Sequence, residues 1–461
     1  MSHRADPAER EIHDFYGRLY RVGQSDRELL GRSRAWMLAA ACLAMLVAGV
    51  GQYGYAAMMP MLGGTHGWSL AASAMVLATW ILCQSSTVYV GAELRSRWNV
   101  TPRFTLAVGA VLCAAGLITL GTSSSLIGAV LSHGVLGGIG AGLIYGTCLG
   151  VVAKWYPERT GRTASVSGAF AYGSIPFVLL AGYFAGPANI EVFLVAASVV
   201  VLVLVGAAGW MLREPPANWW PPHIDPRAWA LDKSVNPGLR NNRPPFRRYA
   251  AGEIVRCPTS ALLFLAVICG TAVALFTIAY LAIFASSSGG GPLFGVLALS
   301  VFVAASGVSR TKARWASETF GRNRVVRLAF YAGAAGELAI LLGGEYGFAA
   351  VLLLGAVAAG GAAGVCYAVL PDLVEGYFGE RPGLPNFGVF YGAKAVGGVL
   401  GVAVAAHVVT AFGYPVVFMA AVVVNLAGAL MVRRLYHVQR QHVVLPTIDQ
   451  GSRRPQGLSV R

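Results

Sequence analysis

Charged residues are scarce in this sequence. Asp, Glu, Lys and Arg together make up 12% of the 461 residues, whereas soluble globular proteins carry about 25%. Acidic residues are the rarer sign, with 20 against 35 basic ones. Together with an apolar share of 56%, this excludes a disordered chain and an ordinary soluble enzyme.

The sequence also lacks the patterns that mark metal centres and catalytic domains. Its seven cysteines form no CxxC pair and no Cys/His metal spacing, so we expect neither disulfides nor bound metal. It contains no P-loop and no Gly-x-Ser-x-Gly motif. We therefore expect no catalytic residues and no cofactor, which argues against a membrane-embedded enzyme.

Long apolar runs are abundant, and a helix that crosses the hydrocarbon core needs about 20 such residues. The sequence predicts an all-α membrane protein with twelve transmembrane helices, at 36–60, 69–91, 104–121, 126–153, 164–187, 190–212, 259–286, 293–315, 325–343, 347–370, 386–411 and 414–432. The polar, Arg-rich segment 1–35 precedes a first apolar run of full length, which is not the pattern of a signal peptide.

The basic residues predict the orientation of these helices. Thirty-three of the 35 lie in or beside the two tails and the loops that follow even-numbered helices, and the other six loops carry none. Because cytoplasmic loops hold the excess of Lys and Arg, we expect a multi-pass protein of the cytoplasmic membrane with both termini cytoplasmic. Basic residues spread along one membrane face indicate the lipid bilayer as partner and not nucleic acid.

The chain divides into two similar halves. A cytoplasmic tail (1–35) precedes a six-helix half (36–212), a Pro- and Arg-rich cytoplasmic linker (213–258), a second six-helix half (259–432) and a tail (433–461). Moving the sequence along by the distance from residue 138 to residue 360, which we call the repeat shift, brings identical residues into register. The pairs are Gly138 with Gly360, Ala141 with Ala363, Gly142 with Gly364, Tyr145 with Tyr367, Glu158-Arg159 with Glu380-Arg381 and Gly161 with Gly383. Such parallel repeats are typical of major facilitator transporters, whose central site lies between the halves.

The linker also predicts a small surface element. It is rich in Pro and Trp, and we expect a short surface helix there, with Trp219, Trp220 and Trp229 at the level of the lipid headgroups.

Apart from the basic residues in or beside loops and tails, two basic side chains, Lys394 and Arg310, fall inside predicted helices, where a charge costs roughly 2.5–3.5 kcal/mol on insertion scales. Lys394 lies eight residues into the eleventh helix, at about 12 Å depth; its alternative role is pairing with a carboxylate such as Glu337. Arg310 lies in the inner half of the eighth helix; its alternative role is an ordinary boundary arginine that reaches the headgroups.

Polar-tipped side chains gather on the same helices. Tyr391 is three residues before Lys394, hence on the same helix face, and Tyr145 and Tyr367 are repeat equivalents that we expect to face each other. The others are Tyr172 in the fifth helix and Gln52, Tyr53 and Tyr55 in the first. Each alone is more typical of packing. Together with two cations they describe a cavity for a small carboxylate, a dianion best of all.

Four blocks of the sequence resemble the oxalate/formate antiporter family of the major facilitator superfamily. They are GGIGAGLIYG with AKWYPERTGRTASVSGAFAYG (137–173), LREPPANWWPP (212–222), SGVSRTKARWASETFGR (306–322) and GYFGERPGLPNFGVFYGAKAVGGVLG (376–401). The resemblance implies that Lys394 and Arg310 grip the carboxylates. It further implies an aromatic cage of Tyr145, Tyr172, Tyr367 and Tyr391, closed by Gln52 or Tyr53.

The sequence departs from this family at several positions. Ala363 stands where a further aromatic residue is expected, and Ser306 and Ser309 replace the usual residues before the arginine. In the loop after the second helix, Ser96 replaces the acidic residue of the superfamily motif. A larger or singly charged carboxylate would fit a cage that lacks one ring.

These observations predict a monomeric secondary transporter that exchanges small organic anions by alternating access. The alternative is proton-coupled uptake of a monocarboxylate. Glu337 and His133 are its candidate proton carriers, although each is more typical of a structural residue.

Overall fold

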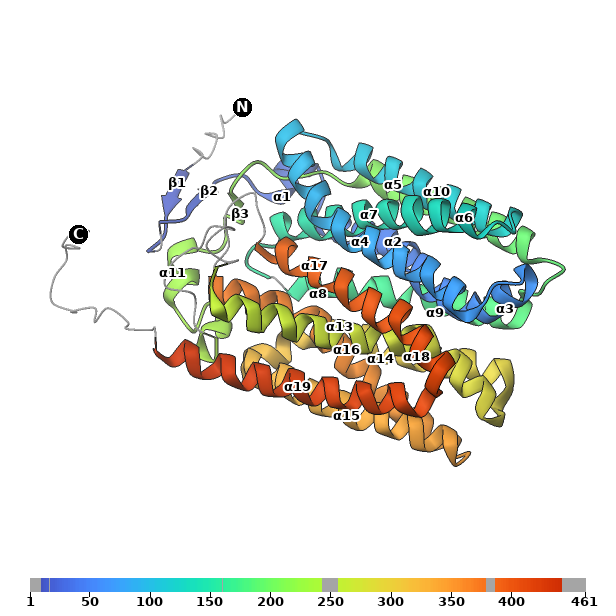
Figure 1. Ribbon diagram of the computed structural model, residues 1–461. Helices are drawn as coiled ribbons and strands as arrows, with labels where there is room; N and C mark the ends of the chain where they lie inside the picture. The colour runs from blue at the N-terminus through green and yellow to red at the C-terminus, as the bar shows by residue number, and fades with distance from the viewer. Residues whose placement is uncertain (1–9, 16, 160, 243–255, 379–385, 442–461) are drawn as a thin grey trace.

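The computed structural model describes residues 10–15, 17–159, 161–242, 256–378 and 386–441. The repeat matches at Glu380-Arg381 and Gly383, and parts of both tails and of the linker, lie outside these ranges. Within them the chain forms a bundle of long helices with a small sheet at one end (Figure 1). The division into tails, halves and linker at the stated residues stays a prediction.

The first half of the chain supplies one side of the bundle and the second half the other (Figure 1). The first contains α1 (Asp26–Leu30), α2 (Ala35–Ala48), η1 (Val50–Gly54), α3 (Tyr55–His66), α4 (Leu70–Trp98), α5 (Pro102–Thr122), α6 (Leu126–Ala129), η2 (Val130–Gly137), α7 (Gly138–Trp155), α8 (Gly161–Tyr172), α9 (Ser174–Phe184) and α10 (Ile190–Met211). The second contains α13 (Pro258–Ala285), η4 (Ser286–Gly290), α14 (Gly291–Phe320), α15 (Arg322–Glu345), α16 (Ala349–Phe378), α17 (Asn386–Gly398), η5 (Val399–Val404), α18 (Ala405–Phe412) and α19 (Tyr414–Gln441).

Eleven helical stretches in the described residues are long and apolar enough to cross a membrane. One of them, Pro258–Phe320, has 63 residues, which is roughly 95 Å of helix and twice the thickness of a bilayer. Its backbone leaves the helical region at Ser288 and Gly289. It therefore makes two crossings, α13 and α14, and the twelve predicted transmembrane helices are found close to their predicted positions.

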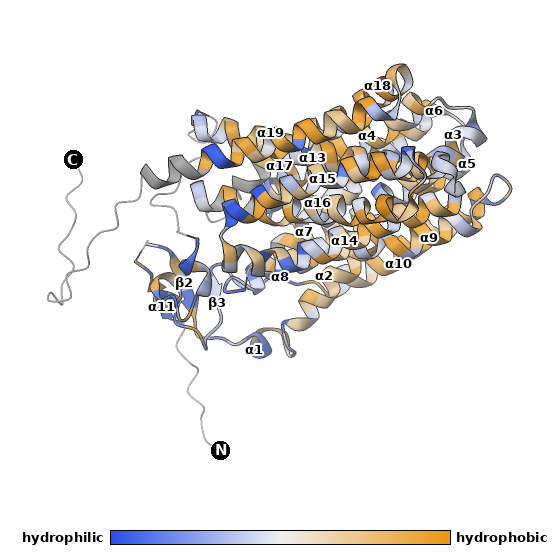
Figure 2. Cartoon of the chain, turned by 90° about the horizontal axis from the view of Figure 1, so that it is seen from below, coloured by the Kyte–Doolittle hydropathy of each residue, from blue (hydrophilic) through white to orange (hydrophobic). Residues whose placement is uncertain are grey.

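The outside of the bundle is apolar. Large aliphatic side chains such as Val192, Leu354 and Val423 are exposed, and hydrophobic residues dominate the long helices (Figure 2). Hydrophilic residues gather at the end that holds the small sheet (Figure 2). This pattern is that of a surface in contact with lipid tails, with a polar end outside the hydrocarbon.

Close helix contacts repeat between the two halves. Glycines on α7 lie against carbonyl oxygens of α4, and glycines on α16 lie against carbonyl oxygens of α14, so closely that a Cβ atom has no room. A Cβ at Gly138 would lie 2.6 Å from the oxygen of Trp80, at Gly142 2.6 Å from Gln84, at Gly360 2.2 Å from Phe302 and at Gly364 2.2 Å from Ser306. The repeat shift found in the sequence relates Gly138 to Gly360 and Gly142 to Gly364.

A small three-stranded sheet marks what we call the sheet end of the bundle (Figure 1). Strand β1 (Arg10–His13) pairs antiparallel with β2 (Leu19–Val22), and β2 pairs parallel with β3 (Trp219–Trp220) of the linker. The linker continues through the short helix α11 (Pro226–Leu231) and the turn η3 (Pro237–Arg240). The C-terminal end of α19 lies at this same end (Figure 1).

The short linker helix is confirmed, but the predicted headgroup position is wrong for Trp219 and Trp220. Both side chains are buried, with 6% and 2% exposed. Trp219 packs edge-on against Trp155 of α7, and Trp220 packs against Tyr20 of β2. For both side chains, contact with other aromatic rings therefore replaces contact with lipid.

The linker is attached to both halves at the sheet end. On the first half, the indole of Trp155 donates to the backbone oxygen of Arg213 at 2.7 Å. On the second half, the amide of Asn242 donates to the oxygen of Ser317 at 2.9 Å and accepts from the backbone nitrogen of Arg322 at 3.0 Å. These contacts fix the linker across the ends of helices from both halves.

Candidate functional site

A small buried cavity lies between the two halves. Its lining comes from both of them: Gln52 of η1, Tyr145 of α7, Phe170 of α8, Arg310 of α14, Tyr367 of α16, and Tyr391 and Lys394 of α17. The centre of a water-sized sphere can move within about 10 Å³, which is room for about one water molecule. The structure therefore brings six of the eight predicted binding residues to one enclosed site.

Lys394 is buried in this site and is held by neutral groups. Its Nζ donates to Oε1 of Gln84 at 2.7 Å, to Oε1 of Gln52 at 3.4 Å and to the hydroxyl of Tyr391 at 3.5 Å. Its side chain is 3% exposed. In the described part of the chain it pairs with no carboxylate, and Glu337 instead contacts Thr277, so the alternative of a Lys394–Glu337 pair is not what the structure shows.

Arg310 also points inward. One guanidinium nitrogen donates to the backbone oxygen of Ser167 at 3.1 Å and the other to the hydroxyl of Tyr53 at 3.1 Å. Its Nε has no partner among the described residues, and its side chain is 3% exposed. A boundary arginine would reach the headgroups, and this one is directed to the interior. Tyr53 contacts the site through this bond, although it is not part of the cavity lining.

Aromatic rings surround the two cations. The guanidinium carbon of Arg310 lies 4.5 Å from the ring centre of Tyr367, and Nζ of Lys394 lies 5.8 Å from the same centre. The rings of Tyr145 and Tyr391 stack at 5.6 Å. These contacts hold both charges beside π-electron faces, which stabilise cations in the absence of an anion.

Tyr172 is the predicted cage member that the structure places elsewhere. Its hydroxyl lies 3.4 Å from Oγ1 of Thr311, and its ring fills the space above Gly307 of α14. This position is a contact between α8 and α14 beside the cavity, not in its lining. The repeat shift makes Tyr172 the equivalent of Lys394, yet the two side chains occupy different environments.

Three further residues of the site were not predicted from the sequence. Gln84 accepts from Lys394, Ser167 accepts from Arg310, and the ring of Phe170 lies edge-on to Tyr145 at 5.4 Å. A carboxamide in the middle of an apolar helix is a signal that identifies Gln84. Ser167 acts mainly through its backbone oxygen, and the sequence carries no signal for such a contact.

The two candidate proton carriers lie outside the cavity lining. Glu337 is 1% exposed; its Oε1 lies 2.6 Å from the hydroxyl of Thr277, and Oε2 has no partner among the described residues. His133 lies 3.2 Å through Nε2 from the backbone oxygen of Gly51. Both are buried polar groups, and their roles stay predictions.

Comparison with known proteins places the chain in a family. A family model described as the Major Facilitator Superfamily matches residues 41–381. The chain belongs to this superfamily. As a member of the major facilitator superfamily it is a multi-pass membrane protein and a secondary transporter, not an enzyme.

Individual relatives are distant. An uncharacterized 38 kDa protein in the 23S RNA operon of Thermoproteus tenax is 27% identical over 388 residues, which is 83% of this chain and 88% of that protein. The oxalate:formate antiporter of Oxalobacter formigenes is 23% identical over 409 residues, 86% of this chain and 90% of that protein. A mutant of the nucleoside transporter NupG matches with a TM-score of 0.66 at 12% identity, covering 87% of this chain and all of that one, which shows the fold alone.

The location of the cavity is that of the central site of the superfamily. In such transporters the substrate site lies near the midplane between the two halves. Here Gln52, Tyr145 and Phe170 come from the first half, and Arg310 and Lys394 come from the second. The two basic groups and the hydroxyl and amide groups around them form a site suited to an anion.

Proposed function

We propose that the protein exchanges small carboxylate anions, oxalate- or formate-like, by alternating access. The observation that carries this proposal is the pair of buried cations, Arg310 and Lys394, which have no carboxylate partner in the described residues. Similarity to the oxalate:formate antiporter of Oxalobacter formigenes supports it. Arg310 would offer a planar fork to one carboxylate and Lys394 a point charge to another.

Exchange follows from the cost of closing an empty site. Two uncompensated charges withdrawn from water are costly, since a buried charge that lacks its partner destabilises a protein by about 3–5 kcal/mol. A dicarboxylate neutralises both and lets the halves close around it. The empty carrier then reorients slowly, which favours exchange over one-way leak.

The cavity in this conformation requires movement before a substrate enters. It has room for about one water molecule, which is too little for a dicarboxylate. Gln52 and Gln84 are the groups that would turn, because an amide that now accepts from Lys394 can rotate to donate its NH₂ to an anion. The halves would separate at one end to admit the substrate and would close again with it bound.

The test is counterflow in proteoliposomes of the purified protein, with labelled oxalate, formate and larger mono- and dicarboxylates. We expect Lys394→Met and Arg310→Gln to lower apparent affinity or exchange about 10- to 100-fold, since a hydrogen bond to a charged group contributes about 1.5–3 kcal/mol. Lys233→Met and Arg240→Gln, on the exposed linker, are the matched controls and should exchange as the wild type does. Thermal unfolding shows that each variant is folded.

Full exchange in folded Lys394→Met protein would refute the proposal. A wild type that carries no carboxylate in the screen would refute it as well. Transport of a neutral or cationic solute that is unaffected by either variant would show that the protein carries another substrate class.

Proton-coupled uptake of a monocarboxylate is the second candidate, and Oε2 of Glu337, which has no partner in the described part of the chain, favours it. A buried carboxyl with a free oxygen can hold a proton without a nearby cation. This function requires an inward proton current that accompanies the substrate. A transport rate that does not respond to a pH gradient would exclude it.

A further inference from the structure

We propose that His133 is a positioning residue for the anion site. It would hold the π-helical segment η1 so that Gln52 and Tyr53 reach the two cations. In its substrate-related part this inference rests on the proposed function. Its structural part, that the imidazole fixes η1, stands independently of the substrate.

Segment η1 interrupts the first transmembrane helix at the level of the site. Residues Val50–Gly54 form a π-helix between α2 and α3. Such bulges are rare, and they occur frequently at functional sites. Here they direct Gln52 to Lys394 at 3.4 Å and Tyr53 to Arg310 at 3.1 Å.

His133 contacts η1 immediately before these two residues. Its Nε2 lies 3.2 Å from the backbone oxygen of Gly51. A carbonyl oxygen only accepts, so the ring carries its hydrogen on Nε2 and donates it. At this bulge the regular i→i−4 pattern of an α-helix is interrupted: the backbone nitrogen of Tyr55 donates to the oxygen of Gln52 and not to that of Gly51. The imidazole provides a side-chain donor to the Gly51 oxygen.

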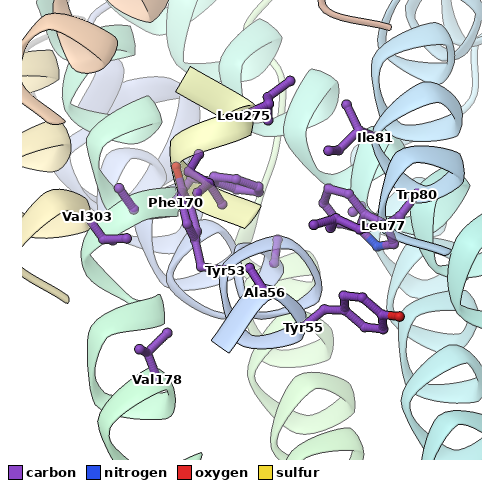
Figure 3. Packing of buried hydrophobic residues seen from close by; sticks show 14 of the residues in the cluster. Tyr53, Tyr55, Ala56, Leu77, Trp80, Ile81, Phe170, Val178, Leu275 and Val303 are labelled. Carbon is purple, nitrogen blue, oxygen red and sulfur yellow. The ribbon is translucent and has the colours of Figure 1, made fainter. Parts of the chain in front are cut away.

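The same ring contacts the segment immediately after them. It stacks on Tyr55 with ring centres 5.1 Å apart and an angle of 20°, and the hydroxyl of Tyr55 donates to the oxygen of Ser73 at 2.9 Å. Figure 3 shows Tyr53 directed towards Phe170, while Tyr55 extends in the opposite direction. His133 therefore contacts the residues on both sides of Gln52 and Tyr53.

The imidazole acts at a distance from the substrate cavity. It lines a separate small cavity with Gly51, Trp80 and Cys113, which has room for about one water molecule. It is not among the residues around Arg310 and Lys394. Any effect of His133 on the anion is therefore transmitted through its contacts with Gly51 and Tyr55.

Two substitutions separate the donor from the bulk of the ring. His133→Gln places an amide nitrogen at a similar reach and keeps a donor to Gly51. His133→Leu has a similar volume and removes the donor. The first measurement is hydrogen–deuterium exchange of a peptide that covers residues 47–58, in detergent, which needs no substrate. We expect at least tenfold faster exchange in His133→Leu and wild-type exchange in His133→Gln.

The second measurement is counterflow of labelled oxalate. We expect His133→Leu to raise the KM about threefold to tenfold, with little change in the maximal rate, and His133→Gln to restore it. In a Gln52→Ala background the substitution at 133 should have a smaller effect, because the two act through the same segment. If His133 carried a coupled proton instead, His133→Gln would abolish transport, since an amide does not titrate.

Wild-type hydrogen exchange in folded His133→Leu protein would overturn the inference whatever the substrate is. An equal increase in His133→Gln would overturn it too, because the donor would then not be the cause. Faster exchange with an unchanged KM would overturn the link to the anion site. If the wild type carries no carboxylate, the proposed function fails, and the hydrogen-exchange result still decides whether His133 fixes η1.

Discussion

The atoms that accept hydrogen bonds from Arg310 and Lys394 are uncharged oxygens. The hydrogen bonds of these two cations in the described residues go to amide oxygens of Gln52 and Gln84, to the backbone oxygen and hydroxyl of Ser167, and to phenol hydroxyls. Neutral acceptors take hydrogen bonds from both groups but leave the charges uncompensated, and Nε of Arg310 has no partner among the described residues. An anion can therefore displace them, whereas it would compete poorly with a fixed carboxylate.

Glu337 offers the residue-scale test between exchange and proton coupling. Glu337→Gln keeps the shape of the side chain and a polar contact to Thr277, but it removes the titratable proton. Under anion exchange we expect counterflow within about twofold of the wild type. Under proton symport we expect loss of the proton current, measured with a pH-sensitive dye inside proteoliposomes. Glu345→Gln, on the exposed end of α15, is the control and should leave both measurements unchanged.

The sequence predicted the cations of the site better than their partners. Lys394 and Arg310 were predicted because charge at membrane depth is costly and therefore rare. Tyr172 was included as a polar-tipped side chain and assigned to the cage by resemblance, and only the structure shows that it packs on Gly307 beside the cavity. A backbone acceptor such as Ser167 depends on how two helices cross, and residue types do not encode that crossing in a readable pattern.

At the scale of helices, the paired crossings of α7 on α4 and α16 on α14 give the two halves a common construction. Gly364→Ala would place a Cβ atom 2.2 Å from the oxygen of Ser306, so the helices must separate. We expect a loss of about 1–3 kcal/mol, as for overpacked cores, seen as a lower midpoint of thermal unfolding in detergent. Gly361→Ala, on the same helix with open space around its Cβ position, should unfold as the wild type does. Equal midpoints would contradict the close contact.

The helices themselves were predictable from hydropathy, since a span of about 20 apolar residues has few alternatives. The break between α13 and α14 lies within the Ser- and Gly-rich run at 286–291. The small sheet was not predicted. Its third strand, Trp219–Trp220, pairs with Arg21 and Val22 near the start of the chain, and short strands with distant partners leave no local periodicity.

At the scale of the whole molecule, the orientation in the membrane is the prediction that most needs a measurement. The distribution of Lys and Arg predicts that the sheet end is cytoplasmic. Single cysteines would be introduced at Tyr346, which is 71% exposed in the turn at the opposite end, and at His223, exposed on the linker. With the native cysteines replaced, a membrane-impermeant thiol reagent added to intact cells should label position 346 and not position 223. The reverse pattern would invert the topology.

The pairing of β2 with β3 also sets an order for biosynthesis. Strand β2 ends at Val22 and β3 begins at Trp219, so the first six crossings are all made before the two strands can meet. At the usual rate of translation this takes roughly 10–40 s. During that interval the edge of β2 has no partner from the linker, and exposed edges are prone to pair wrongly. A completed sheet therefore requires that the first half has been fully synthesised, and its strands can meet before the second half has entered the membrane.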